Sequence, residues 1–506
     1  MWVPSAGALP PAGRYPSREV ALDRPSDAEE EVLRRINEER RARGLAPFAW
    51  EPILSAVARE HSEDMAKYDY LDYTSPRLGT IEYRRHRAGC PAGNLRLAIA
   101  SAASAEAIVR QFSRDQEPFH LGDGTHLGVG IATRGLLRQM YATLIAADVH
   151  SVLEPFPTMP LYGKKYRLAG RIEKGFSDPR LLVALPDGQV TELGLSLSPN
   201  GEFSTLVAFD RGKGEYILEI VADGRLGPVV LNLMRCYAGV PYPEPPVESQ
   251  SDSTPGDLHV AELAMLEMIN RERARAGLNP LRFDERLAAV AREHSRDMLL
   301  NHFFAHVSPT RGDLAARIAR AGLTESARAF TENIAANRSL REAHEGLMNS
   351  PGHRRNIMDP LAESAGIGIV RRGDDLLVTQ NFARRSPDYD PDSLAREFLE
   401  AANEVRRARG LAPLVEDPTL GRFARENSSA MKRDRRAGHD RARQLLGEAR
   451  FPYAVQIGIL RSSEPPRPEH IAQVLEGKYR RIGIGIAQAE SEPRDLWTTV
   501  LLAEQE

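Results

Sequence analysis

Two histidines and a glutamate in the middle of the chain are the side chains best suited to binding chemistry. His306, Glu332 and His353 lie 26 and then 21 positions apart. Two imidazoles and a carboxylate can ligate a divalent transition metal such as Zn²⁺, or bind a polar or anionic molecule without a metal. They can also form a buried hydrogen-bond network that only joins a helix to a loop. No single helix spans these separations, so only the fold can bring the three together.

The pattern before His306 predicts helices. Residues 287–298 repeat apolar side chains at helical spacing, and His294 falls on the apolar face of that helix. We therefore interpret His294 as a core histidine, together with His61, which has the same place in an earlier segment. Asp313 is suited to cap a second, short helix.

The pattern after Glu332 predicts another helix and a hairpin. Ser339, with Glu342 three residues later, fits a capping box that begins a helix through Leu347. Pro351-Gly352 should end that helix and leave His353 just beyond it. The segments GIGIVRR and DLLVTQNF then alternate as two strands joined by a turn. Together these elements predict an α+β domain.

The chain repeats itself. The segment INRERARAGLNP from Ile269 recurs without a gap 233 positions earlier and, in weaker form, 133 positions later. Such self-similarity indicates duplicated domains, which we place at residues 29–150, 258–386 and 393–506. We interpret the shared Gly-x-x-Pro as a helix end, because Gly closes a helix and Pro forbids its continuation. These pairs are Gly44 and Pro47, Gly277 and Pro280, and Gly410 and Pro413.

The outer copies lack parts of the candidate site. At the first histidine position, copy one has Tyr73 and copy three has His439. Copy one has no glutamate in register, and Val455 takes that place in copy three. His120 is a partial match to His353 in copy one. We interpret the outer copies as degenerate domains that serve assembly or shape.

The rest of the chain differs in composition. Residues 158–240 contain short alternating strands at regular spacing, which predicts an all-β sandwich; GEYILEI there is similar to a strand of immunoglobulin-like domains. We expect this module to be a spacer or an adhesive unit. Residues 241–257 and 387–392 have the composition of linkers, and residues 1–28 that of a disordered N-terminal segment.

The composition narrows the function classes. With 42% hydrophobic and 27% charged residues, the chain is typical of soluble globular proteins, and its net charge of −3 gives no reason to expect nucleic acid as a partner. No apolar run is long enough to span a bilayer, and residues 1–28 lack the features of a signal peptide. Cys90 and Cys236 either form an interdomain bond or are free thiols, and neither has metal-ligand spacing.

The motifs around the candidate residues resemble those of a known family. AHVSP, TENIA, NSPGHRRNI and GIGIV with VTQNF are similar to the signature of the CAP superfamily, which includes cysteine-rich secretory proteins, antigen 5 and plant pathogenesis-related proteins. They are most similar to its short bacterial branch. The resemblance implies an α-β-α sandwich in each of the three copies, an open cleft in the central one, and an extracytoplasmic location.

The family's cleft carries two histidines and up to two glutamates, and the resemblance assigns these by position. His306 matches the first histidine, Glu332 the glutamate of the G-E-N-[IL] motif and His353 the histidine of the G-H motif. Ser350 falls where the second glutamate would be. Thr331 replaces the usual glycine. The implied ligand-binding cleft is therefore His306, Glu332, Ser350 and His353.

Three functions remain open from the sequence. The first is a non-enzymatic binding protein whose cleft holds a small molecule, a lipid or a divalent metal on His306 and His353, while the other modules contact a protein or cell-surface partner. The second is a metal-assisted hydrolase with Glu332 as general base. The third is a purely structural surface protein. We favour the first, because the sequence has neither an H-E-x-x-H nor a G-x-S-x-G motif.

Overall fold

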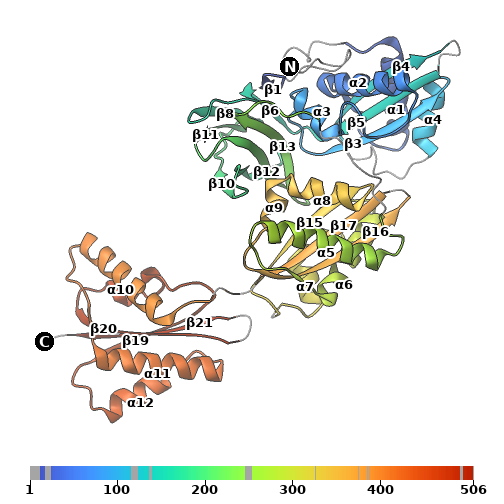
Figure 1. The fold of residues 1–506 in the computed structure, drawn as a ribbon. Coiled ribbons are helices and arrows are strands. Elements are labelled where there is room, and N and C mark those ends of the chain that lie inside the picture. The colour runs from blue at the N-terminus through green and yellow to red at the C-terminus, as the bar shows by residue number, and fades with distance from the viewer. Residues whose placement is uncertain are drawn as a thin grey trace.

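The computed structural model contains three domains of mixed helix and sheet and one β-sandwich, which lies between the first two domains (Figure 1). It describes residues 12–17, 24–114, 124–135, 139–245, 254–324, 326–373, 375–384, 386, 388–490 and 494–504.

The central domain, copy two, is a three-layer α-β-α sandwich, as predicted. Its sheet has the order β14-β16-β17-β15, and only the β14–β16 pair is parallel. Helices α5 and α8 contribute to the core on one face, and α6 and α7 to the core on the other. The strands are β14 (Arg282–Phe283), β15 (Ala329–Asn337), β16 (Ala362–Arg372) and β17 (Asp375–Arg384). The helices are α5 (Leu258–Arg275), α6 (Glu285–Leu300), α7 (Leu314–Arg320), α8 (Leu340–Met348) and α9 (Pro351–Ile357).

Copies one and three repeat this sheet topology, with orders β2-β4-β5-β3 and β18-β20-β21-β19. Copy one contains α1 (Asp27–Ala42), β2 (Ala49–Trp50), α2 (Pro52–Tyr68), α3 (Ile81–Arg87), β3 (Leu95–Ala102), α4 (Ala105–Arg114), β4 (His126–Arg134) and β5 (Gln139–Ala147). Copy three contains α10 (Pro391–Ala408), β18 (Val415–Glu416), α11 (Pro418–Asp434), α12 (Asp440–Glu448), β19 (Val455–Ser462), two short 3₁₀ helices, β20 (Tyr479–Gln488) and β21 (Leu496–Glu504).

A Gly-x-Gly pair brings a helix onto the sheet in every copy. In copy two, a Cβ on Gly366 or Gly368 of β16 would lie closer than 3.0 Å to the backbone of α6. Ser295 of that helix donates its hydroxyl hydrogen to the Gly368 carbonyl oxygen, with the two oxygens 2.9 Å apart. The equivalent glycines are Gly128 and Gly130 in copy one and Gly483 and Gly485 in copy three. The absence of side chains on this strand therefore sets the helix–sheet distance.

The Gly-x-x-Pro turn ends a helix, as expected. Gly277 follows α5 with φ +70°, a left-handed conformation that glycine adopts without strain. Asn270 of that helix then clamps the returning chain: its amide donates to the Leu281 carbonyl oxygen at 3.0 Å, and its Oδ1 accepts from the Leu281 N–H at 2.7 Å. Asn37 and Asn403 make the same pair of bonds in the outer copies. These shared residues are structural.

The module between copies one and two is an antiparallel β-sandwich. Its sheets have the orders β10-β9-β12-β13 and β11-β8-β6. The Tyr216 hydroxyl donates to the Gly212 carbonyl oxygen at 2.8 Å, a contact typical of the tyrosine corner in immunoglobulin-like domains. The strands are β6 (Ser151–Leu153), β8 (Lys165–Ile172), β9 (Ser177–Ala184), β10 (Val190–Gly194), β11 (Glu202–Ala208), β12 (Gly214–Gly224) and β13 (Gly227–Ala238).

Part of the N-terminal segment is ordered, so the expectation of disorder over residues 1–28 is wrong for residues 12–17 and for Asp27 and Ala28, which begin α1. There β1 (Arg14–Tyr15) pairs with β7 (Phe156–Pro157) beside the sandwich. The Tyr15 side chain is fully buried in the sandwich core, and its hydroxyl donates to the Arg235 carbonyl oxygen at 3.1 Å. Burial of this large aromatic ring offsets the entropy lost by ordering the segment. Residues 1–11 and 18–23 lie outside the described part of the chain.

The two cysteines are free thiols, so they do not form the interdomain bond that the sequence left open. Each is buried in its own module, Cys90 in copy one and Cys236 in the sandwich. Burial raises the pKa of the Cys90 thiol to about 12. Both thiols are therefore unreactive side chains that contribute to packing.

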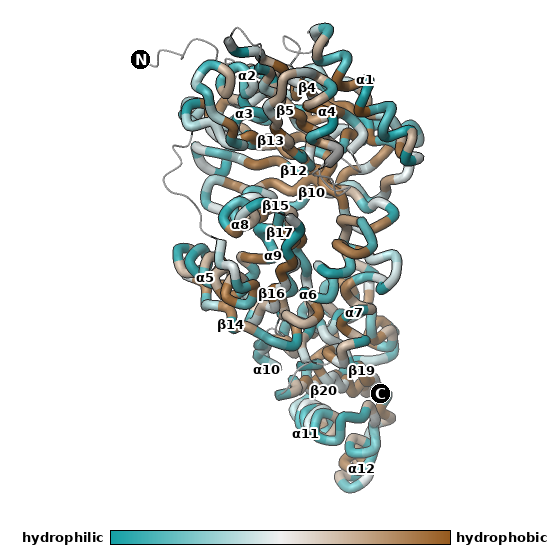
Figure 2. The backbone as a smooth tube through the Cα atoms, turned by 90° about the vertical axis from the view of Figure 1, so that its right-hand side faces the viewer, coloured by the Kyte–Doolittle hydropathy of each residue, from teal (hydrophilic) through white to brown (hydrophobic). Residues whose placement is uncertain are grey.

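Hydrophobic residues follow the interior strands, and the outer turns of helices such as α11 are mainly hydrophilic (Figure 2). In the described residues, no helix has the length and apolar character required to cross a membrane. Copy three follows copy two after a short segment. Arg328 of copy two contacts copy three, because its guanidinium donates to the Ser463 carbonyl oxygen and to the Glu464 carboxylate.

Candidate functional site

Glu332 and His306 meet in copy two, although 26 positions separate them in the sequence. Glu332 lies on β15 and is only 8% exposed. Its Oε1 is 3.0 Å from His306 Nδ1. Burial alone would raise the pKa of the carboxyl, but the His306 hydrogen bond and the nearby His294, His306 and Arg317 hold that pKa below its ordinary value. Glu332 is therefore an ionised acceptor, and His306 Nδ1 is the donor.

Arg317 is a functional residue that the sequence reasoning missed. It lies on α7 with its side chain 0% exposed, and its Nη2 donates to Glu332 Oε2 at 2.5 Å. Its Nη1 donates to the carbonyl oxygen of His306 at 3.0 Å. Arg317 thus fixes both the glutamate and the backbone of the first histidine. The sequence did contain one sign of it: copy one has an arginine, Arg84, 233 positions before Arg317, which is the offset between these two copies. The structure shows that Arg84 is buried as well.

His353 lies within a helix, which corrects the expectation that Pro351-Gly352 leaves it beyond one. Pro351 begins α9 instead, because proline suits the first position of a helix, where its missing N–H has no partner to lose. Ser350 caps this helix, and its Oγ is 2.7 Å from His353 Nδ1. Burial, reinforced by the nearby His306, lowers the pKa of His353 to about 3, so the ring is neutral.

The structure places the two candidate imidazoles next to each other. The ring centroids of His306 and His353 are 6.4 Å apart, with 31° between the ring planes. Asn333 links the two segments, because its amide donates to the His353 carbonyl oxygen at 3.1 Å and its neighbour on β15 is Glu332. In both rings the Nδ1 atom is held by an oxygen of the protein. Within the described part of the chain neither Nε2 atom has a hydrogen-bond partner, so these are the nitrogens left for a ligand.

His294 and His61 are buried core residues, as expected. Both have no exposed surface, and each Nε2 contacts a backbone carbonyl oxygen, that of Ala305 at 3.1 Å and that of Asp72 at 2.8 Å. His294 also lies 3.9 Å from Glu332 Oε1. Burial lowers the pKa of His294 to about 4, so it borders the site as a neutral ring.

A carboxylate from the β-sandwich reaches the site, which no sequence pattern indicated. Glu219 lies on β12 and is fully buried. Its Oε1 accepts the Ser350 hydroxyl hydrogen at 2.5 Å, and its Oε2 accepts the Gly352 N–H at 2.7 Å. Burial raises the pKa of Glu219 to about 7, although these two bonds and the Arg355 charge act in the opposite direction.

This raised pKa predicts a pH-dependent attachment of the sandwich to copy two. A carboxyl that titrates near 4.5 when unfolded and near 7 when folded stabilises the folded state below pH 4.5, and that contribution is lost as the pH rises to 7. The loss is about 3 kcal/mol. His353, whose pKa falls from 6.5 to about 3 on folding, changes the stability in the opposite direction over part of this range, so the Glu219 contribution has to be isolated by comparison with a variant. Urea unfolding of the unmodified protein and of a variant without this carboxyl, compared at several pH values, isolates the slope.

The matched variant for this measurement is Glu219→Gln, which cannot titrate. The unfolding free energy of the unmodified protein, measured relative to that of Glu219→Gln, should fall by about 3 kcal/mol between pH 5 and pH 8. Equal pH slopes for the two proteins would contradict the assignment of this titration to Glu219.

The corresponding places in the outer copies differ. In copy one, Arg84 Nη2 donates to the carbonyl oxygen of Tyr73 at 3.3 Å, and His120 lies outside the described residues. In copy three, His439 borders a cavity of about 300 Å³. Its lining is Arg443, Leu446, Phe451, Tyr453, Val455, Gln456 and Ile457. Copy three therefore keeps a cleft with a partly apolar wall but without the glutamate.

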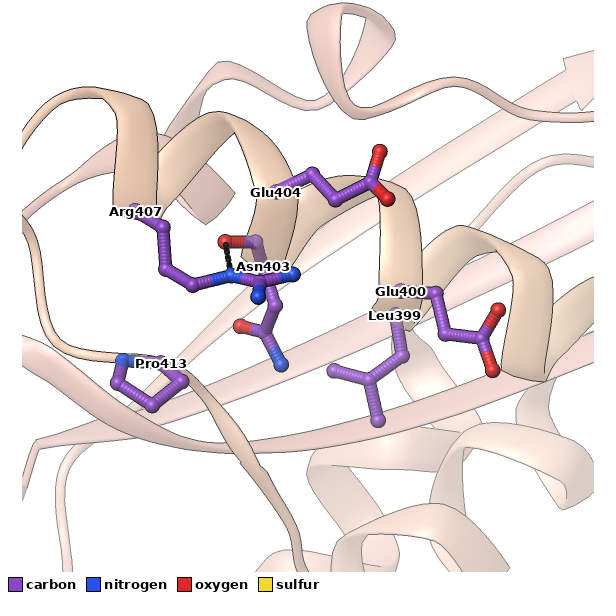
Figure 3. A pocket seen from close by; sticks show the side chains of 6 residues that line it. All are labelled: Leu399, Glu400, Asn403, Glu404, Arg407 and Pro413. Carbon is purple, nitrogen blue, oxygen red and sulfur yellow. Dashed lines mark hydrogen bonds between the residues drawn. The ribbon is translucent and has the colours of Figure 1, made fainter.

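A second depression lies along α10 of copy three, away from these positions (Figure 3). It is lined by Leu399, Glu400, Asn403, Glu404, Arg407 and Pro413. Arg407 Nε donates to the Asn403 carbonyl oxygen at 3.2 Å, and Asn403 is the structural clamp described above. This depression belongs to the helix end and carries no candidate site residue.

The donor set at His306 and His353 suits a divalent transition metal. Neutral imidazole nitrogens are common ligands of such ions. The oxygen atoms of Glu332 and Ser350, which contact the Nδ1 atoms, orient the two rings. Across the described ranges, no group of three or more His, Cys, Asp or Glu side chains is placed to hold a metal. The protein would therefore contribute two imidazoles, and the remaining ligands would be water or a bound molecule.

Two curated relatives from Bacillus subtilis (strain 168) are similar to part of the chain. The uncharacterized protein YkwD is 37% identical over 131 residues, which are 26% of this chain and 49% of YkwD. The uncharacterized membrane protein YlbC is 36% identical over 126 residues, 25% of this chain and 35% of YlbC. The chain thus spans half or less of the length of these relatives.

Solved structures are similar at lower identity. An extracellular protein with an SCP domain from Bacillus anthracis is 22% identical, with 47% of this chain and 67% of that chain covered and a TM-score of 0.23. An outer surface protein from Borrelia burgdorferi is 21% identical, with coverages of 26% and 96% and a TM-score of 0.24.

The family comparison covers most of the chain. The model of the CAP family, described as the cysteine-rich secretory protein family, matches residues 33–152, 266–382 and 399–501. These are the three domains that share one sheet topology and one helix–sheet contact. The chain is therefore a member of the CAP family and carries the domain three times.

Proposed function

We propose that this protein is a non-enzymatic, extracytoplasmic binding protein whose central cleft holds a small ligand or a divalent metal between His306 and His353. The observation that carries the proposal is the arrangement of the two rings. Each Nδ1 is bonded to an oxygen of the protein, at 3.0 Å from Glu332 and 2.7 Å from Ser350, and the rings lie side by side. This arrangement supports binding through the two Nε2 atoms.

The state of Glu332 supports binding rather than hydrolysis. A general base needs an accessible lone pair and a pKa near the working pH. Both Glu332 oxygens instead accept bonds from His306 and Arg317, and the pKa of the carboxyl is lowered. The alternative of a metal-assisted hydrolase with Glu332 as base therefore has less support. The alternative of a purely structural role also has less support, because it assigns no function to the two Nε2 atoms.

The other modules are suited to contacts with partners rather than to ligand binding at a complete site. The outer copies keep the helix–sheet framework and lack the complete set of site residues, so they suit contacts with a protein or cell-surface partner. The cavity at His439 has a mostly polar exposed lining, which suits a small polar ligand better than a lipid. The extracytoplasmic location is supported by membership of a family described as secretory.

Zinc titration of the full-length chain tests the proposal. We expect Zn²⁺ to bind the unmodified protein and to lose its binding in the double variant His306→Ala/His353→Ala. The matched control is His259→Ala/His470→Ala, which removes two exposed histidines elsewhere and should bind zinc normally. Calorimetry gives the affinity, and circular dichroism checks that each variant is folded. Equal zinc binding by the site variant and the unmodified protein would refute the proposed site.

A further inference from the structure

The β-sandwich contacts both histidine segments of copy two. The Leu226 carbonyl oxygen, at the β12–β13 turn, accepts the Val307 N–H at 3.0 Å. Gly227 in the same turn has φ +102°, and a Cβ there would lie only 3.2 Å from the His306 Cβ. The close approach therefore uses a glycine where a side chain would press on the first histidine.

At the second histidine the contact is polar. Glu219 projects from β12 out of the sandwich, and its two oxygens accept the Ser350 hydroxyl and the Gly352 N–H at the start of α9. A separate ion pair joins Arg355 of α9 to Glu192 of β10 at the more exposed edge. Two carboxylates of the sandwich thus meet one short helix, and only Glu219 touches the residue that contacts the His353 ring.

We infer that Glu219 is a positioning residue for the central site: through Ser350 it fixes the tautomer of His353, so that the sandwich and copy two form one binding unit. A serine hydroxyl has a single hydrogen. Because Ser350 donates that hydrogen to the Glu219 carboxylate, its oxygen can only accept from His353, and the His353 hydrogen must lie on Nδ1. The Nε2 atom then carries a lone pair.

The same logic holds at the other ring. Glu332 accepts from His306 Nδ1, so a hydrogen of that ring lies on Nδ1, and Nε2 is the nitrogen that can offer a lone pair. Both rings then act as electron-pair donors. The ligand class that fits is a divalent cation, or a molecule that offers N–H or O–H donors, and a ligand with only acceptor atoms is disfavoured. Glu219 thus brings a carboxylate to Ser350, the position at which the family resemblance placed a second glutamate.

This inference rests on the proposed function, and Glu219→Gln in the full-length chain tests it. The Gly352 N–H still needs an acceptor, so the Gln carbonyl oxygen should face it and the Gln NH₂ group should face Ser350. Ser350 would then accept from the amide and donate its hydrogen to His353 Nδ1. The matched control is Glu192→Gln, which removes the other sandwich carboxylate on α9 and leaves Ser350 untouched.

Two readouts at pH 8.5 separate the possible results. Nitrogen-15 NMR of labelled histidines reports which ring nitrogen carries the hydrogen, and the spectrum of His353→Gln assigns the signal. We expect the hydrogen on Nδ1 in the unmodified protein and in Glu192→Gln, and on Nε2 in Glu219→Gln. Zinc affinity should fall about tenfold to a hundredfold in Glu219→Gln alone.

Either of two results would overturn the inference: a Glu219→Gln protein that keeps the hydrogen on Nδ1, or a Glu192→Gln protein that shows the same change as Glu219→Gln. The second result would mean that docking of the sandwich, and not the Glu219 carboxylate, orients the ring. A failure of the unmodified protein to bind zinc would reject the proposed metal site only, since the NMR signal reports the His353 tautomer without any ligand.

Discussion

Replacing Glu332 with alanine is expected to destabilise copy two by about 3–5 kcal/mol, because it leaves the Arg317 charge buried without its counter-ion. The Arg317 side chain has no exposed surface, and its Nη2 lies 2.5 Å from Glu332 Oε2. The remaining bonds of Arg317 to backbone carbonyl oxygens do not neutralise its charge. Hydrogen exchange of the β15 and β17 amides measures the local free energy of opening without requiring the whole chain to unfold in one step.

The control for this experiment is Glu363→Ala in the same domain. Glu363 pairs with Arg282 at 3.8 Å, with side chains 48% and 79% exposed. Exposed pairs of this kind contribute about 1 kcal/mol or less. If Glu332→Ala and Glu363→Ala change the β15 and β17 exchange equally, the buried network does not stabilise the domain as described.

The second large effect is expected at Gly368. Its replacement by alanine places a Cβ against the backbone of α6 near Arg292, closer than 3.0 Å. A backbone contact cannot be relieved by rotating a side chain, so the helix must move away from the sheet and the Ser295 bonds to Gly368 and Thr379 must stretch. Overpacking typically costs 1–3 kcal/mol, and here we expect about 3 kcal/mol or more. The same exchange experiment on the α6 amides measures it.

Gly346→Ala is the matched control, because Gly346 is an exposed residue within α8 and a Cβ there meets nothing within 4 Å. Alanine is favoured over glycine inside a helix by about 0.5–1 kcal/mol. The two glycine-to-alanine changes should therefore have opposite signs. If Gly368→Ala leaves the exchange of the α6 amides unchanged, the helix and the strand can separate without a loss of stability.

The fold could be predicted because its signals are local and repeated. The apolar spacing of residues 287–298, the caps at Asp313 and Ser339, and the turn at Gly277 each depend on a few neighbouring residues, and the structure has all of them. The threefold similarity also predicted three domains, and the family model matches all three. One local error concerned Pro351, which can end a helix or begin one.

The site could be predicted only in part, because its assembly depends on contacts far apart in the chain. The motif resemblance selected His306, Glu332 and His353, and these are the groups that meet. It could not select Glu219, whose carboxylate comes from a module with no similar motif and sits among the apolar residues of YILEIVA. Arg317 was missed because an arginine on a short amphipathic helix has the appearance of a surface residue.

The path of the chain through the first two modules has a consequence for how the protein is made. Strand β1 precedes copy one, whereas β6 to β13 follow it, so copy one is an insertion within the fold of the sandwich. During synthesis copy one emerges first and can fold as a unit. Tyr15 must wait until Phe156 and Arg235 have left the ribosome before its pocket exists. The order of emergence therefore makes completion of the sandwich a late event, and attachment of copy two, which needs Glu219 in place, follows it.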